Sequence, residues 1–338
     1  MMNRKKEIFK NLKNVAKVIV SLLLVIWLLR QIDLKKLYFV LRSGSLPLLI
    51  TGSVLLFLST IITQSARLHV LIRRYTLSYW RTCKLLFISM FFNMFLPTSV
   101  GGDGYKVIFL KGVGIDNWGK PFILVFLERF IGLLVLLGIG FFYFIINYKN
   151  LIIRLHDNNL EIQFNTWILR FAIAFVFFII VAIFTIFSIR NRKNSFIART
   201  FNRLKVFLKD CKTTLKEMDK SVYLSVLAIT FIFHLLRAFG FYFWILYFDE
   251  KILVIDILFV MSFTAFVSLV PMSLGALGVR EGAAAFGFII FGLSKSNAIT
   301  IAFMDRILLI LYAVIGGIIF LLRKRSDGGF SEKSKIPS

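Results

Sequence analysis

The chain has 338 residues, of which 58% are hydrophobic and 16% aromatic, and its mean hydropathy is +0.82. A soluble surface does not tolerate this composition, so the sequence indicates an integral membrane protein. Lys and Arg number 42 against 17 Asp and Glu, a net charge of +25. In a membrane protein, basic cytoplasmic loops and anionic lipid account for such an excess, and the sequence contains no recognisable nucleic-acid-binding module. We therefore expect no nucleic-acid partner.

Cysteine and histidine are too scattered to form a metal site or a disulfide framework. The two cysteines, Cys83 and Cys211, lie far apart, each in or beside a basic loop. The three histidines show no ligand spacing such as HExxH. We expect no metal, no cofactor and no structural disulfide.

The N-terminus combines a basic arm with an apolar run from Val15 to Leu29. This combination resembles a signal peptide, but no small-x-small cleavage site follows it, so we expect an uncleaved first span. The predicted organisation is a cytoplasmic basic arm over residues 1–14, a transmembrane domain over residues 15–325 and a polar tail over residues 326–338.

Apolar runs near the length of about 20 residues that a helix needs to cross a bilayer predict six full spans. They are Val15–Leu29, Leu46–Ala66, Phe122–Tyr148, Trp167–Ile189, Val222–Phe248 and Ala298–Leu322. Two more apolar stretches, Leu85–Leu110 and Ile255–Leu293, are interrupted in the middle by Pro and Gly. The sequence thus predicts an all-α integral membrane protein with six spans and two broken stretches.

Basic residues orient these segments. The N-terminal arm, the loop Arg190–Lys220 and the end of the last span are rich in Lys and Arg, which predicts that both termini and this loop are cytoplasmic. The termini and this loop lie on the same side only if Leu85–Leu110 enters the membrane from the cytoplasm and returns to the cytoplasm. Ile255–Leu293 must likewise return to the outside, as a re-entrant hairpin or as two short spans. The outside loops are then Lys149–Asn165 and Asp249–Lys251.

The two broken stretches share one motif. The pattern P-x-S-x-G-x-x-G-x-[KR] runs from Pro97 to Lys106 and again from Pro271 to Arg280. Each copy precedes a span that carries an acid–Arg pair near its start. Because the copies enter from opposite sides, they predict an inverted-topology repeat, which many transporters build around a midplane site. The alternative is that these Pro and Gly residues only kink membrane helices.

A helix broken inside the membrane favours a binding site. It frees N–H and C=O groups that lipid cannot satisfy, so such backbone survives only against protein or in a wet cavity. Pro ends the first half-helix, Ser can cap the second, and Gly lets the backbone approach a ligand. The second half-helix then presents free N–H groups and its positive dipole end to an anion such as a lipid phosphate.

Charged residues near the breaks should face a cavity or each other, because an isolated charge inside the membrane is costly. Adjacent residues on a helix point apart, so we expect Glu128 and Arg129 to pair across the repeat with Arg306 and Asp305. An alternative places these pairs at the headgroup level, where they anchor span ends. The candidate substrate-binding residues, in which four cations balance four carboxylates, are Pro97, Ser99, Gly101, Gly102, Asp103, Gly104, Lys106, Glu128, Arg129, Pro271, Ser273, Gly275, Gly278, Arg280, Glu281, Asp305 and Arg306.

The segments Asn93–Asp103, Leu127–Gly132 and Val270–Gly282 together resemble the flippase-like transmembrane family, named for the membrane region of bacterial lysylphosphatidylglycerol synthase/flippase. The resemblance covers about residues 10–325. It implies a bacterial cytoplasmic-membrane domain that moves or accommodates a modified phospholipid or polyprenyl-linked lipid with an anionic or zwitterionic headgroup. The best-known member adds a soluble aminoacyl-transferase, whereas this chain ends in a short polar tail, so we do not expect lysyl transfer by this polypeptide.

Three functions are compatible with these features. The favoured one is a lipid flippase or lipid transporter. The second is a membrane accessory or enzyme subunit in glycolipid, polyprenyl-phosphate sugar or aminoacyl-lipid synthesis, acting with a lipid-biosynthesis enzyme. The third is a solute or ion transporter. Transport is favoured over catalysis and no catalytic residue is assigned, while cargo, direction, energy source and oligomeric state stay open.

Overall fold

The computed structural model of the protein describes residues 44–75, 77–95, 101–114, 118–157, 206, 209–210, 212–269 and 278–322. Within these ranges all regular secondary structure is helical, which confirms the predicted all-α class. Two of the six predicted spans, Val15–Leu29 and Trp167–Ile189, lie outside the described residues.

The first half of the described chain has the order long, short, short, long. Its first long rod is continuous and has Pro47 in its first turn, where the missing N–H costs nothing. A π-helix interrupts the regular hydrogen bonding of this rod, a feature that is frequent at functional sites. The elements are α3 (Leu46–Phe57), the π-helix η1 (Leu58–Thr63), α4 (Gln64–Leu71), α5 (Tyr79–Phe95), α6 (Gly101–Gly112) and α7 (Gly119–Asp157).

The second half repeats this order of lengths. Its elements are α10 (Lys220–Tyr247), α11 (Val254–Ser268), α12 (Val279–Ile290) and α13 (Lys295–Leu322). The two halves therefore match element by element, with the rod of α3, η1 and α4 in the place of α10.

The long helices coincide with predicted spans. Four helices in the described part are long and apolar enough to cross a membrane: Leu46–Leu71, Gly119–His156, Lys220–Tyr247 and Lys295–Leu322. They confirm four of the six predicted spans as helices of sufficient length and composition.

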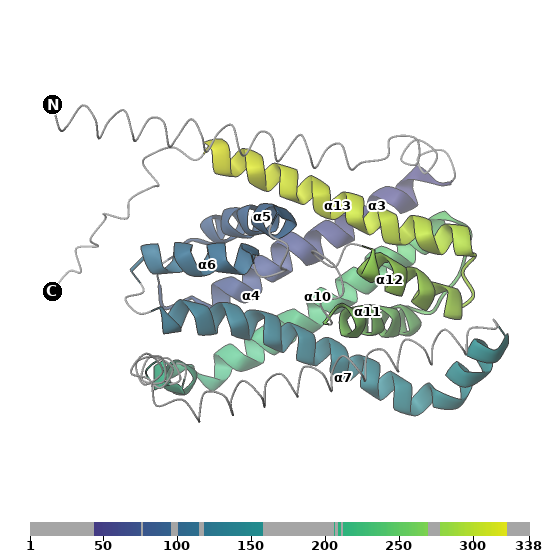
Figure 1. Cartoon of the computed structure of the whole chain (residues 1–338), viewed down its shortest axis with the longest axis horizontal. Coiled ribbons are helices and arrows are strands. Elements are labelled where there is room, and N and C mark those ends of the chain that lie inside the picture. Colours follow the sequence, from purple (N-terminus) through teal and green to yellow (C-terminus); the bar gives the residue numbers. More distant parts are fainter. Residues whose placement is uncertain are drawn as a thin grey trace, which may run out of the picture.

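Both predicted helix breaks are present. Helix α5 ends at Phe95 and α6 begins at Gly101, while α11 ends at Ser268 and α12 begins at Val279. Figure 1 shows the α5–α6 pair at one end of the molecule and the α11–α12 pair at the opposite end. At that second end, the Ser294 hydroxyl donates to Glu250 at 2.8 Å, which ties the chain after α12 to the chain before α11. Each short pair thus enters and leaves at its own end of the bundle.

The two halves run in opposite directions. Trp244, near the end of α10, donates to the carbonyl of Leu49 near the start of α3 at 3.3 Å. Asp219, just before α10, pairs with Arg73, just after α4, at 2.7 Å. The rod α3–η1–α4 and α10 are therefore antiparallel neighbours, as the crossing helices in Figure 1 also show.

Two glycines also allow helices of different halves to pack closely. A Cβ at Gly316 of α13 would collide with the backbone carbonyl of Phe87 on α5, and a Cβ at Gly140 of α7 would collide with Ser262 on α11. The last long helix of each half thus packs closely on the first short helix of the other half. The largest cluster of buried apolar side chains lies among α3, α7, α10, α11, α12 and α13.

Candidate functional site

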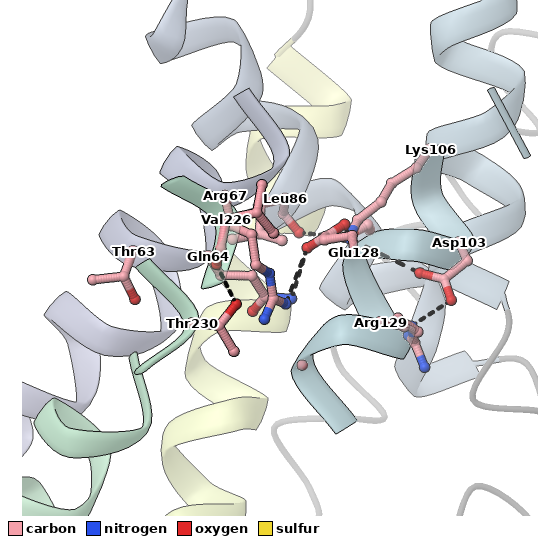
Figure 2. Close-up of polar contacts among 12 residues, drawn as sticks. Thr63, Gln64, Arg67, Leu86, Asp103, Lys106, Glu128, Arg129, Val226 and Thr230 are labelled. Carbon is pink, nitrogen blue, oxygen red and sulfur yellow. Dashed lines mark hydrogen bonds and ion pairs between the residues drawn. The ribbon is translucent and has the colours of Figure 1, made fainter. Parts of the chain in front are cut away.

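A buried carboxylate, Glu128 on α7, lies at the centre of the first charged group. Lys106 Nζ from α6 lies 2.9 Å from Glu128 Oε2, and Arg67 Nη2 from α4 lies 3.5 Å from Oε1. Gln64 donates to the same Oε1 at 3.4 Å. Figure 2 shows the side chains of Lys106 and Gln64 reaching Glu128 from opposite sides. Because all the charged members are buried, each depends on the others for compensation.

Asp103, in the first turn of α6, extends this group toward the surface. Its carboxylate lies 3.9 Å from Lys106 Nζ and forms an ion pair with Nε of Arg129. The Arg129 side chain is 43% exposed, unlike the buried Lys106. The group therefore runs from a fully buried centre at Glu128 to an accessible guanidinium at Arg129 (Figure 2).

The start of α6 is fixed against α5. The N–H of Gly102 donates to Asn93 Oδ1 at 2.8 Å, which satisfies one of the free donors of the helix N-terminus. A Cβ at Gly102 would collide with the carbonyl oxygen of Ser89, so glycine is needed for this approach. Gly102, which lies between the motif glycines Gly101 and Gly104, thereby places Asp103 and Lys106 beside α7.

A second charged group surrounds Asp305 on α13. Arg237 Nη2 from α10 lies 2.6 Å from Asp305 Oδ1, and Arg280 Nη2 from α12 lies 3.1 Å from Oδ2. Arg237 also donates to the hydroxyl of Thr60, in η1 of the other half, at 3.2 Å. The Arg280 side chain is 37% exposed, whereas Asp305 is buried.

Glu281 and Arg306 complete this second group. Nε of Arg306 donates to Glu281 Oε1 at 2.6 Å, and Glu281 Oε2 accepts the N–H of Gly278 at 2.8 Å. Gly278 has a φ of +80°, a conformation that favours glycine. Gly278 thus directly precedes α12, and the Glu281 side chain caps the N-terminus of this helix.

The two groups have equivalent members. The motif cations Lys106 and Arg280 each hold the carboxylate of the following long helix, Glu128 and Asp305. The first ion cluster consists of Arg67, Lys106 and Arg129 with Asp103 and Glu128. The second ion cluster consists of Arg237, Arg280 and Arg306 with Glu281 and Asp305. With three cations and two carboxylates, each cluster has a formal charge of +1.

The arginines that produce this excess were not among the candidates. Arg67 and Arg237 each follow a threonine by seven residues, Thr60 and Thr230, on the first long rod of their half. Arg237 is a lone charge inside the predicted span Val222–Phe248, and this was a signal that could have identified it. The sequence predicted four cations and four carboxylates, whereas Arg67 and Arg237 raise the number of cations in the two clusters to six.

Pairing across the repeat is not what the structure shows. Glu128 and Arg129 find their partners on α4 and α6, and Asp305 and Arg306 find theirs on α10 and α12. The expectation was wrong because each short pair folds back onto its own long helix. Between the halves, Arg237 instead donates to Thr60, and Arg306 Nη1 lies 3.9 Å from the Met94 sulfur.

The structure places the other candidates as follows. Gly101 and Gly104 lie in the first turn of α6, and a Cβ at Gly104 would meet nothing within 4 Å. In the described part, no group of three or more His, Cys, Asp or Glu could hold a metal ion. The candidates Pro97, Ser99, Pro271, Ser273 and Gly275 lie outside the described residues.

The model of the family described as lysylphosphatidylglycerol synthase TM region matches residues 14–317. The chain belongs to this family. The matched region of the lysylphosphatidylglycerol synthase TM family includes both ion clusters and every helix from α3 to α12, so the family assignment and the geometry concern the same part of the chain. The assignment confirms the resemblance noted from the motifs and relates this membrane protein to lipid modification or lipid flipping. No curated protein and no solved structure matches the chain.

Proposed function

We propose that this protein moves a lipid with an anionic or zwitterionic headgroup between the leaflets of a bacterial cytoplasmic membrane. The observation that carries the proposal is the +1 charge of each ion cluster. Uncompensated charge away from water costs several kcal/mol, and a lipid phosphate supplies the missing negative charge. Five of the six cations are arginines, whose planar guanidinium binds phosphate through two hydrogen bonds and stays protonated.

Arg129 and Arg280 are the proposed first contacts for the phosphate, because they are the most exposed cations of their clusters. The buried Arg67, Lys106 and Arg237 add positive potential behind them. The carboxylates hold these cations in position or meet an amine on a zwitterionic headgroup. Backbone N–H groups after Ser99 and Ser273 are proposed as further phosphate ligands on the basis of the motif.

We further propose that the two short pairs are re-entrant hairpins in an inverted repeat with six full spans. At 1.5 Å per residue, α6 and α12 are each about 18 Å long, well below the roughly 30 Å of hydrocarbon. Each short pair enters and leaves at one end, and the two halves are antiparallel. These lengths favour the hairpin over two short spans for Ile255–Leu293.

Replacing Arg280 by glutamine should reduce leaflet exchange to the rate of protein-free vesicles. Asp305 keeps Arg237 at 2.6 Å, so no buried carboxylate loses its last partner and the protein should still fold. The measurement is exchange of fluorescent lipids with different headgroups in reconstituted vesicles. The matched control is Arg73→Gln, which removes an exposed arginine and its ion pair with Asp219 outside both clusters. Full exchange by the Arg280→Gln variant, or no exchange by the wild type with any headgroup, would contradict the proposal.

Cysteine labelling tests the orientation. In a background without Cys83 and Cys211, a cysteine at Asn202 should stay unlabelled by a membrane-impermeant maleimide in intact cells, since the Arg190–Lys220 loop is expected in the cytoplasm. A cysteine at Lys251 should react, because this loop is expected outside. Labelling at Asn202 would refute both the orientation and the inverted repeat.

A further inference from the structure

The first part of α7 exposes one narrow face. Between Pro121 and Phe130, the exposed residues are Phe122, Phe126, Arg129 and Phe130, and the other six are buried. The three phenylalanines, which we call the aromatic stripe, are 44%, 48% and 43% exposed. Glu128 lies on the buried side of the same helix. The stripe and the first ion cluster thus share α7 but use different faces of it.

The stripe is a continuous apolar surface. Its members are four residues apart, a spacing that keeps them on one helix face. The rings of Phe122 and Phe126 are 6.3 Å apart at an interplanar angle of 7°, and those of Phe126 and Phe130 are 5.5 Å apart at 15°. The adjoining rings form a continuous apolar strip against which a hydrocarbon chain can lie.

Cations stand at both ends of the stripe. Before it, Lys111 Nζ lies 3.6 Å above the ring of the exposed Trp118, and Lys120 lies in the first turn of α7. After it, Arg129 adjoins Phe130 and is held by Asp103. Gly119, the first residue of α7, and Arg129 are about 15 Å apart along the helix axis, about half the thickness of the hydrocarbon core. The stripe therefore leads from the membrane surface to the depth of the first ion cluster.

The second half lacks an equivalent stripe. Setting Glu128 equal to Asp305 places Ile299, Phe303 and Ile307 of α13 at the stripe positions, and Ile307 is buried. The aromatic stripe is thus a feature of one half only, although the ion clusters occur in both. The two ends of the molecule therefore differ in this exposed aromatic surface.

We propose that the aromatic stripe is the loading site for the lipid, on the side of the membrane where α6 ends and α7 begins. The phosphate binds at Lys111 and Lys120, the hydrocarbon chain lies along the stripe, and Arg129 is the first cluster residue that the headgroup then meets. This inference rests on the proposed function and adds to it the leaflet from which the lipid is taken. The ligand is a phosphate lipid with at least one long hydrocarbon chain.

Site-specific photocross-linking tests the loading site. Phe126 is replaced by p-benzoylphenylalanine, with the same replacement at Phe141, another exposed phenylalanine of α7 beyond Arg129, as the control. The vesicles contain phosphatidylglycerol and phosphatidylcholine in equal amounts, and the cross-linked lipids are identified by mass. We expect at least a threefold enrichment of phosphatidylglycerol at Phe126 and the bulk ratio at Phe141. Adding Lys111→Gln and Lys120→Gln should return the ratio at Phe126 to bulk.

A second set of vesicles carries a polyprenyl phosphate in place of phosphatidylglycerol, and the better enriched lipid identifies the hydrocarbon class. Bulk composition at Phe126 in both sets, or a cross-link to a polypeptide, would overturn the loading site. Leaflet exchange measured in the same vesicles separates the two proposals. Enrichment at Phe126 without exchange would refute transport and leave only a lipid-binding site at the stripe. Exchange without enrichment would refute the loading site alone.

Discussion

Replacing Glu128 by glutamine should destabilise the protein by about 3–5 kcal/mol, the cost of leaving buried charges without their partner. Glu128 is buried and is the carboxylate closest to both Lys106 and Arg67, at 2.9 Å and 3.5 Å. A neutral amide leaves both cations in place without this compensation. The measurement is denaturant or thermal unfolding of detergent-solubilised protein, followed by tryptophan fluorescence.

Two matched variants make this result interpretable. Asp219→Asn breaks the exposed ion pair with Arg73 and should cost less than about 1 kcal/mol. Lys106→Met should cost less than Glu128→Gln, because Glu128 then keeps Arg67 as its partner. Combining Lys106→Met with Glu128→Gln should recover part of the loss. A Glu128→Gln variant no less stable than Asp219→Asn would show that the first ion cluster does not form in the folded protein.

The helix breaks could be predicted from the sequence because their causes are local. Proline removes a donor and glycine relaxes the backbone wherever they occur in a helix, so Pro97 and Pro271 indicated where the two apolar stretches would end their first helices. The structure has α5 ending at Phe95 and α11 at Ser268. The same local reasoning identified Lys106, Arg280 and the acid–Arg pairs as charged residues needing partners.

The identity of those partners could not be predicted in this way. Arg67 lies 61 residues before Glu128, and Arg237 lies 68 residues before Asp305, so the pairs form only when separate helices pack. The π-helix at Thr60, which turns a hydroxyl toward Arg237, has no sequence signature that we could recognise. A rule that every charge inside a predicted span needs a buried partner would have found Arg237.

The match between the halves explains why the charges recur. Each half brings an arginine on its first long rod, a cation on its second short helix and a carboxylate on its last long helix to one place. The two halves are antiparallel, so their short helix pairs lie at opposite ends of the molecule (Figure 1). Under the proposed function, each assembly would receive the headgroup from its own side of the membrane, and the aromatic stripe distinguishes the two sides.

The packing between halves predicts opposite effects for the same substitution at two glycines. Gly316→Ala should destabilise the protein by about 1–3 kcal/mol, because its Cβ would collide with the backbone carbonyl of Phe87, which cannot rotate away. Gly138→Ala on α7 should be neutral or stabilising by up to about 1 kcal/mol, because its Cβ meets nothing within 4 Å and alanine favours the helix.

Unfolding midpoints of the two variants in the same detergent check this prediction. Gly140→Ala, two residues from the control on the same helix, should behave like Gly316→Ala because its Cβ collides with Ser262. Gly138→Ala and Gly140→Ala make the same change in the same helix, so helix propensity and the membrane environment of α7 affect both variants alike. A difference between their unfolding midpoints therefore reports the contact between the halves. If Gly316→Ala and Gly140→Ala unfold at or above the wild-type temperature, the last long helix of each half does not pack on the short helix of the other, and the matched arrangement of the two ion clusters loses its support.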